Sequence, residues 1–319
     1  MPGEPGAGPR LISCIGVESD LALLPHFLGH YADLGIRTDR MHLILQSADP
    51  EHPALDAARE VLGRFGVTPH EVWIAPYTSD GMWQKRREVQ ASVAAEGDWI
   101  ISADADEFHE YPEPLPDFLD RCAALGVTCT QGVFIDRLAP GGALAQIDPS
   151  PALSAQFPVM ADVIARIGGT GRHHNRYGTV KLMAIRSHVM PSRGGHHPLG
   201  GQPGVAHLFG RPLAEFSRIE MPAFRFRVPL RVHHYHWSAG LAASLERRLA
   251  TPGVSAAGQE YGAKILAHLK EHGGVDLDQV ATTRSEISLW PLRLAAMRME
   301  SRVRLQARRV RHGLSRVRP

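Results

Sequence analysis

Three acidic side chains lie close together in the sequence, directly after an apolar segment. The segment is Trp99–Ala103, and the acids are Asp104, Asp106 and Glu107. If the extended backbone continues, Asp104 and Asp106 share one face, because side chains alternate with a period of two along a strand. Two such carboxylates offer the hard oxygen ligands that Mg²⁺ and Mn²⁺ prefer. The competing interpretation is an acidic turn that ends the strand and caps the following helix.

The elements before these acids follow a regular strand–helix rhythm. Helical periodicity, with apolar residues on one face, fills the gaps between the strand-like segments. This spacing predicts βαβ units with right-handed crossovers, and therefore an α/β fold with a mostly parallel sheet and helices on both faces. Ligands of such sheets bind beyond the carboxyl ends of the strands, which is where the acids lie. The expected strands are Leu11–Val17, Met41–Leu45, Val72–Ala75 and Trp99–Ala103.

The remainder of the chain is less regular. One further helix-then-strand unit is expected at Leu115–Leu125 and Val127–Ile135. Residues 138–178 are rich in Pro, Gly and Ser, which indicates loops with short helical pieces. The later elements that we expect are strands at Thr179–Arg186 and Val232–Tyr235 and helices at Ser238–Leu249, Gly258–Lys270 and much of 284–311.

The segment Asp104-Ala-Asp106-Glu107-Phe108 resembles the DxDEF motif of GT-A glycosyltransferases, in their family-2-like and family-92-like group. The resemblance covers about residues 10–250. Two positions depart from the family pattern: Val17 stands where Asn is usual, and His236 where Lys is common. Weaker similarities, in the family's order, are found at Ile15–Glu18, Met41–Asp49, Lys181–Arg186, Gly194–His197 and His234–Trp237.

The resemblance implies a GT-A, Rossmann-like domain that transfers a sugar from a UDP- or GDP-sugar to an acceptor hydroxyl. In the family, Asp106 would ligate Mn²⁺ or Mg²⁺ and Asp104 would lie nearer the ribose. Glu107 would either orient the ligands or cap the following turn. A metal suits this chemistry, because negative charge develops on the departing diphosphate. A nucleotidyltransferase and a degenerate nucleotide-sugar-binding module remain the alternatives.

Further candidates surround the acidic motif. His197 and His234 are the first and second choices to complete the metal site. No HExxH pattern supports a zinc hydrolase. Lys181 could meet a phosphate, and Trp237 could stack on a sugar or a base. The full set expected to bind the nucleotide sugar is Glu18, Asp49, Lys85, Asp104, Lys181 and Trp237.

An inverting transfer requires a general base that deprotonates the acceptor hydroxyl. Asp136 is the preferred carboxylate, since it follows the apolar segment Val133–Ile135 and could emerge at the edge of the sheet. Together with Glu107 it forms the expected catalytic pair. Inversion and retention both stay open. The other carboxylates that could serve as the base are Asp148, Asp162 and Glu220.

The charge of the 319-residue chain is nearly balanced, with 35 Lys and Arg against 33 Asp and Glu, which argues against a nucleic-acid-binding protein. The balance hides an asymmetry. Residues 293–319 contain nine Arg and one Glu, a net charge of +8, which leaves −6 for the rest. We expect a disordered leader at 1–10, the GT-A domain at 11–285 and a basic helical tail at 286–319. The tail could contact anionic lipid or dock on the domain.

The compartment follows from cysteine content and apolar segments. Three Cys give no disulfide framework, so we expect them to be small buried residues of a reducing compartment. The N-terminal segment lacks the apolar core of a signal peptide, and no apolar stretch is long enough for a membrane span. These features predict a cytoplasmic enzyme, with peripheral contact at the inner face of the membrane still allowed.

Overall fold

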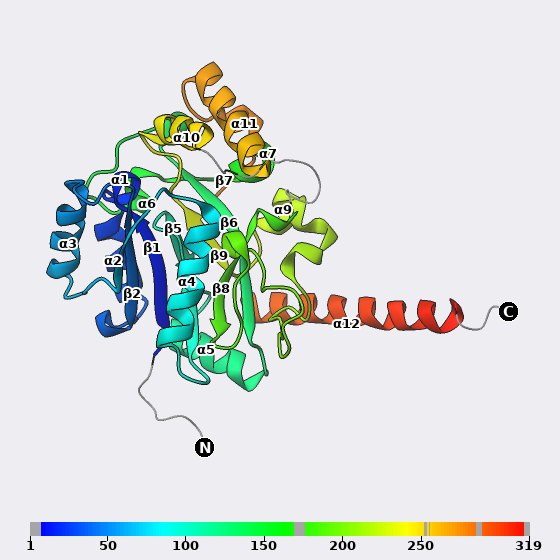
Figure 1. The fold of residues 1–319 in the computed structure, drawn as a ribbon. Coiled ribbons are helices and arrows are strands. Elements are labelled where there is room, and N and C mark those ends of the chain that lie inside the picture. The colour runs from blue at the N-terminus through cyan, green and yellow to red at the C-terminus, as the bar shows by residue number, and fades with distance from the viewer. Residues whose placement is uncertain (1–7, 169–175, 252–253, 255, 285–288, 316–319) are drawn as a thin grey trace.

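The computed structural model describes residues 8–168, 176–251, 254, 256–284 and 289–315, except the side chains of residues 257 and 308–315. Within these residues the chain forms one mixed sheet that is flanked by helices (Figure 1). The strands are β1 (Arg10–Gly16), β2 (Met41–Ser47), β3 (Glu71–Ile74), β4 (Trp99–Ser102), β5 (Glu107–Glu110), β6 (Cys129–Leu138), β7 (Val159–Ala161), β8 (Val180–Arg186), β9 (Arg231–His234) and β10 (Thr282–Thr283).

The first half of the sheet is parallel, in the order β3-β2-β1-β4. β8 then joins β4 in the antiparallel direction, and β6, β7 and β10 continue the sheet with antiparallel pairs. β9 lies off this path, parallel to β6 and antiparallel to β5. The expected α/β class is confirmed, and the acids at 104–107 follow a strand that lies between the parallel and the antiparallel halves.

Helices cover both faces of the parallel half, because its buried strands point side chains in both directions. Ile12 and Cys14 of β1 belong to a core that also contains side chains of α4, the helix in front of the sheet in Figure 1. Leu11 and Ile15 pack in the opposite core with α2, α3 and α5. The longer helices are α2 (Leu24–Asp33), α3 (Ala54–Arg64), α4 (Ser79–Val93), α5 (Leu115–Ala124), α10 (Leu241–Ala250), α11 (Ala256–His272) and α12 (Trp290–Ser315).

Short helices complete the irregular regions. The segment expected to be loop with helical pieces also contains the short strand β7. The α-helical turns are α1 (Val17–Asp20), α6 (Leu153–Gln156), α7 (Val163–Arg166) and α9 (Pro222–Arg225). The 3₁₀ turns are η1 (Thr38–Arg40), η2 (Pro140–Gly142), η3 (Arg193–Gly195), η4 (Leu213–Glu215), η5 (Ser217–Glu220) and η6 (Leu277–Gln279).

Several expectations are refined by the structure. The Thr78 hydroxyl caps α4 by accepting a hydrogen bond from the Gly81 amide at 3.2 Å. β5, which begins at Glu107, was not predicted, because its four residues are mostly polar. All three Cys are buried free thiols, as expected. Residues 1–7 of the expected leader lie outside the described residues, and Arg10 already belongs to β1.

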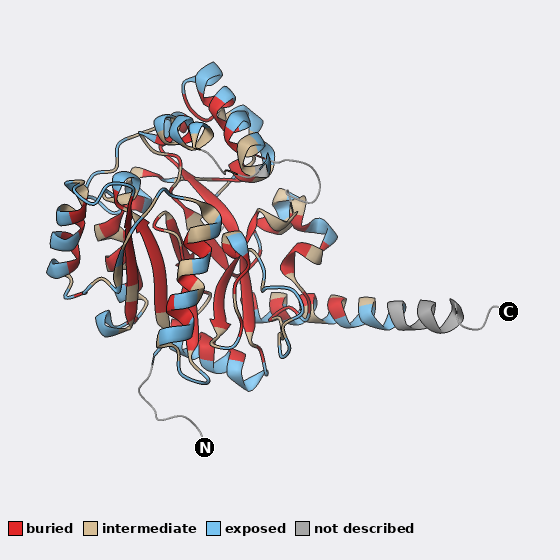
Figure 2. Ribbon diagram, viewed as in Figure 1, coloured by how far each residue is buried: buried red, intermediate tan, exposed pale blue. Residues whose placement is uncertain are grey.

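Residues Trp290–Ser315 of the expected tail form the helix α12, which extends away from the body of the molecule (Figure 1). Along its first turns, buried residues alternate with exposed ones (Figure 2), so one face of the helix is buried and the other is exposed. Among the described residues, no helix combines the length and the apolarity that crossing a lipid bilayer requires.

We expect Gly132→Ala to destabilise the fold by about 1–3 kcal/mol, because a side chain there has no room. Gly132 lies in β6 between β8 and β9, and a Cβ atom would meet the Met183 sulfur at 2.2 Å and the Leu230 carbonyl oxygen at 2.8 Å. The control is Gly63→Ala in the exposed surface of α3, where a Cβ atom meets nothing within 4 Å. That change should stabilise by about 0.5–1 kcal/mol. Urea unfolding of both variants measures the difference, and equal stabilities would contradict the packing argument.

Candidate functional site

The pairing of β9 with β5 and β6 brings together segments that are far apart in the sequence. His234, at the end of β9, lies opposite Glu107 of β5 and also opposite Asp136 of β6. The backbone amide of Tyr235 donates to the Asp106 carbonyl oxygen at 2.8 Å. The acidic motif is therefore fixed to β9 at the carboxyl end of β4, the edge at which ligands of such sheets bind.

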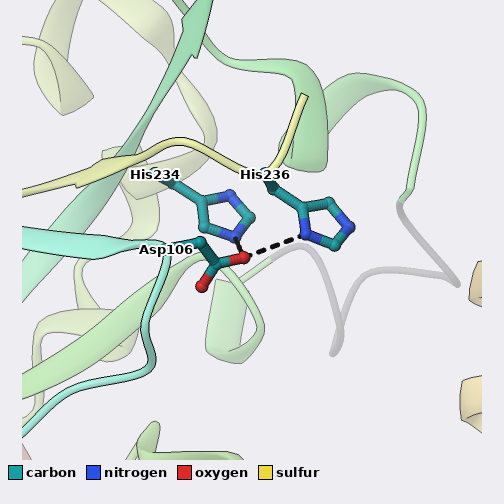
Figure 3. Close-up of side chains that lie close together, drawn as sticks. All are labelled: Asp106, His234 and His236. Atoms are coloured by element: carbon teal, nitrogen blue, oxygen red, sulfur yellow. Dashed lines mark hydrogen bonds and ion pairs between the residues drawn. The ribbon is translucent and has the colours of Figure 1, made fainter. Parts of the chain in front are cut away.

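Asp106, His234 and His236 form a compact group, which we call the Asp106 cluster (Figure 3). The Asp106 Oδ2 atom lies 3.0 Å from His236 Nδ1 and 3.4 Å from His234 Nε2. One ligand atom from each residue lies within 4.8 Å of the others. A carboxylate oxygen and two imidazole nitrogens that face a common point can bind a divalent transition metal such as Mn²⁺.

The other nitrogen of His234 is held by a buried carboxylate. His234 Nδ1 lies 3.0 Å from Asp136 Oδ1, and the Trp237 indole donates to the same oxygen at 2.8 Å. The Ile164 amide donates to Asp136 Oδ2 at 2.9 Å. Burial by itself would lower the pKa of His234, but Asp106 and Asp136 outweigh burial and raise the pKa to about 10. Without a cation, His234 therefore holds a proton between two carboxylates.

Asp104 belongs to a second group, which is ionic and mostly buried. The Lys181 ammonium donates to Asp104 Oδ2 at 2.8 Å and to Glu107 Oε1 at 2.6 Å. The Arg86 guanidinium donates to Asp104 Oδ1 at 2.6 Å, and Glu107 Oε2 accepts from the Asp104 amide at 3.1 Å. Lys181 and Glu107 are each 2% exposed, whereas Asp104 is 32% exposed. We call these four residues the Lys181 network.

The charges of the Lys181 network move the pKa values of its carboxyl groups in opposite directions. Burial alone would raise the pKa of Asp104, but Lys181 and Arg86 outweigh burial and lower it. Burial and the Asp104 charge raise the pKa of Glu107 to about 7, against the effect of Lys181. Asp104 is thus held as a carboxylate that faces the open edge of the network.

The donor set of the Asp106 cluster fits a divalent cation. Burial opposes the charge of Asp106, but His234 and His236 outweigh burial and lower its pKa, so this group is a ready anionic ligand. The Asp136 carboxylate fixes the ring of His234 in the way that outer carboxylates orient metal-binding histidines. Asp104 has both carboxylate oxygens engaged by Lys181 and Arg86, so Asp106 is the better-placed ligand of the two acids.

The other expected metal ligand, His197, does not join the Asp106 cluster. Its Nδ1 atom lies 2.9 Å from the Pro198 carbonyl oxygen, and the side chain is exposed. The preceding turn lies against the Lys181 network instead, since a Cβ atom on Gly195 would come 3.0 Å from Lys181 Cε.

The expected nucleotide-sugar ligands are spread over several places. Glu18 accepts hydrogen bonds from the Ser47 hydroxyl and the Ala48 amide, and so joins the ends of β1 and β2. Asp49 is exposed nearby. Lys85 forms ion pairs with Glu71 and Glu88 on the outer side of α4, so the structure does not bring it to the Lys181 network.

Trp237 and Asp136 were expected to meet substrate, but both are buried and hydrogen-bonded to the protein. The Trp237 side chain is fully buried, so neither ring face is open for stacking. Asp136 is 1% exposed and accepts from three protein donors, which favours an orienting role toward His234 over contact with an acceptor hydroxyl.

The other base candidates differ in their surroundings. Asp162 is buried and accepts from the Ala281 amide and from Arg166. Glu220 forms an ion pair with Arg176 at 3.4 Å, and Asp148 is exposed.

Two residues of the site, Arg86 and His236, were not among the expected ligands, although simple periodicity could have found them. Arg86 follows Met82 by four residues and precedes Val89 and Gln90, so all four share the buried face of α4. Lys85 is instead partly exposed and pairs with Glu71 and Glu88. His236 lies two residues after His234, which is the alternation of an extended chain.

No protein-family model matches the chain, and no curated protein matches its sequence. Among solved structures, the crystal structure of S. aureus TarS overlaps the chain with a TM-score of 0.29 and 10% sequence identity. The overlap covers 82% of this chain but only 43% of the TarS chain. A TM-score of this size carries no argument about the activity of this chain.

We expect Lys181→Met to destabilise the fold by about 3–5 kcal/mol, because the change leaves buried carboxylates without their counter-charge. The matched control is Lys85→Met, which breaks two ion pairs of partly exposed side chains. Such pairs contribute about 0–1 kcal/mol. Chemical denaturation measures both variants. A Lys181→Met protein as stable as Lys85→Met would refute the assigned role of the buried ammonium.

Proposed function

We propose that the protein is a metal-dependent glycosyltransferase of the GT-A kind, which transfers a sugar from a UDP- or GDP-sugar to an acceptor hydroxyl. The observation that carries the proposal is the Asp106 cluster, since it places a DxD carboxylate and two imidazoles together at the carboxyl end of β4. Its support is twofold: the sequence of the acidic motif resembles the family's, and the donor set suits Mn²⁺ or Mg²⁺.

Each residue of the two groups then has a distinct task. Asp106, His234 and His236 would hold the cation, and Asp136 would keep His234 oriented with its Nε2 atom toward the cation. When bound, the cation supplies positive charge that stabilises the departing diphosphate. Asp104, fixed by Arg86 and Lys181, would accept hydrogen bonds from the nucleotide through its partly exposed carboxylate. Glu107 fixes the backbone of the motif by accepting from the Asp104 amide.

The role of Asp106 is tested by Asp106→Asn, which weakens one ligand without changing the size of the side chain. We expect Mn²⁺-dependent binding of UDP-glucose or GDP-mannose to fall by more than about 100-fold, since loss of a mere outer partner already costs 10–100-fold. Calorimetric titration, with EDTA as the metal-free reference, measures the affinities. The control Asp120→Asn removes an exposed acid of α5 that has no assigned role in the site. Unchanged Mn²⁺-dependent affinity in Asp106→Asn would remove the metal role.

A control variant at a second buried acid can separate the orienting role of Asp136 from its contribution to stability. Asp136→Asn should lower Mn²⁺ affinity by about 10–100-fold, because His234 loses the carboxylate that fixes its ring. Asp162→Asn is the matched control, since Asp162 is equally buried and accepts from the Ala281 amide but does not contact His234. Both variants should lose stability, and only Asp136→Asn should lose metal affinity. Equal Mn²⁺ affinities of the two variants would contradict the orienting role.

Catalysis itself is tested by slow hydrolysis of nucleotide sugars, which needs no knowledge of the acceptor. A glycosyltransferase should release UDP or GDP from one preferred donor in the presence of Mn²⁺, and EDTA should abolish the release. A protein that binds nucleotide sugars with Mn²⁺ but never turns them over would instead be a binding module. Chromatography of the released nucleotide distinguishes the two outcomes.

A further inference from the structure

α12 is fixed to the body of the protein along one face. Trp290, Leu294, Met297 and Ser301 are all buried, and their spacing of three and four residues places them on the same side of the helix. The Trp290 ring lies 6.2 Å from the Phe118 ring, measured between centroids. The orientation of the helix about its own axis is therefore set by packing.

Polar contacts strengthen this attachment. Glu300 pairs with Arg211 at 2.7 Å and with Arg218 at 2.6 Å, so one carboxylate of α12 bridges two arginines of the body. The Ser301 hydroxyl donates to the Phe209 carbonyl oxygen at 2.7 Å, and the Arg304 guanidinium donates to the Glu215 carbonyl oxygen at 2.6 Å. These contacts hold the docked face through residue 304.

The opposite face of α12 carries an apolar stripe that no described residue covers. Leu292, Met299 and Val303 are 66%, 66% and 60% exposed, and the spacing of seven and four residues places them in one line. Leu292 follows the buried Trp290 by two residues, which turns it to the other side of the helix. Because the docked face is fixed, this stripe is presented outward permanently.

The charge around the stripe indicates what kind of surface it meets. Residues 293–319 contain nine Arg and one Glu. Arg302 is exposed beside the stripe, and Arg293 is partly exposed. A second copy of the same helix would bring two such basic segments together, which like-charge repulsion opposes. An anionic lipid surface attracts the arginines and accepts the apolar side chains among its acyl chains.

We propose that α12 is a membrane-surface helix that binds anionic phospholipid, with Leu292, Met299 and Val303 inserted at the boundary of headgroups and acyl chains. At 26 residues the helix is about 39 Å long, so it can lie along a membrane over several headgroups. The docked face holds the body above this plane. The site at the carboxyl end of β4 would then work at a fixed height above the lipid surface.

The experiment is co-sedimentation of the full-length protein with vesicles of phosphatidylcholine, with and without phosphatidylglycerol. The wild-type protein should pellet with the phosphatidylglycerol vesicles and should be released as salt is raised. Met299→Glu should weaken binding by more than about tenfold, because it removes an apolar side chain that would insert into the membrane and adds a charge that anionic lipid repels. The matched control is Met221→Glu, a similarly exposed Met (54%) outside α12, which should bind like the wild type.

Each other result overturns the proposal. Wild-type protein that stays in the supernatant, or that pellets equally with both kinds of vesicle, excludes recognition of anionic lipid. Equal binding of Met299→Glu and wild type excludes insertion of the stripe. A dimer in light scattering that Met299→Glu dissociates would assign the stripe to a second copy of the chain. Thermal melting of Met299→Glu at the wild-type temperature shows that the fold is intact, so that a loss of binding is read as a loss of contact.

Discussion

The buried ammonium of Lys181 is the interaction on which the rest of the site depends. Burying the Asp104 and Glu107 carboxylates at the end of a strand is unfavourable unless a cation compensates them. Lys181 supplies that cation from β8, because β8 pairs antiparallel with β4 and projects the side chain beneath the acidic motif. The ammonium also lies over the ring of Trp83, 5.2 Å from its centroid. Trp83 belongs to α4, so this helix covers a second side of the Lys181 network.

The two aspartates of the motif are compensated by chemically different partners. Asp104 is paired with Lys181 and Arg86, whose charges persist at any ordinary pH, so its position is fixed at all times. Asp106 is paired with His234 and His236, and imidazoles can exchange a proton for a metal ion. Asp104 is therefore held permanently by its partners, whereas Asp106, two residues later, has partners that can exchange a proton for a metal ion. This difference between the two aspartates suits a site that must keep its shape while a cation and a charged substrate bind and dissociate.

The sequence predicted the local part of this arrangement and missed the long-range part. The βαβ rhythm and the acids after Trp99–Ala103 are readable because they depend on periodicity within a short window. A strand was expected at Val232–Tyr235, but β5 was not, and their pairing joins segments more than a hundred residues apart that nothing local in the sequence connects. For that reason Asp136 was expected at an open edge, whereas the neighbouring β9 covers it. Arg86 was not among the expected ligands, although Trp83, three residues before it, and Gln90, four residues after it, lie on the same buried face of α4.

The position of the site between two halves of the sheet affects how precisely the sequence specifies the strand register. The parallel half contributes the acidic motif, β8 of the antiparallel half contributes Lys181, and β9, which lies off the main path, contributes His234. Because Lys181 and His234 reach the acidic motif through strand pairing, the charge balance of the site depends on correct register across β4, β8, β6 and β9. A slip of β8 by one residue would turn Lys181 to the opposite face, which would leave Glu107 without its cation and Asp104 with Arg86 alone. The cost of that unpaired charge favours the native register, so the ionic groups of the site also help to specify the fold that contains them.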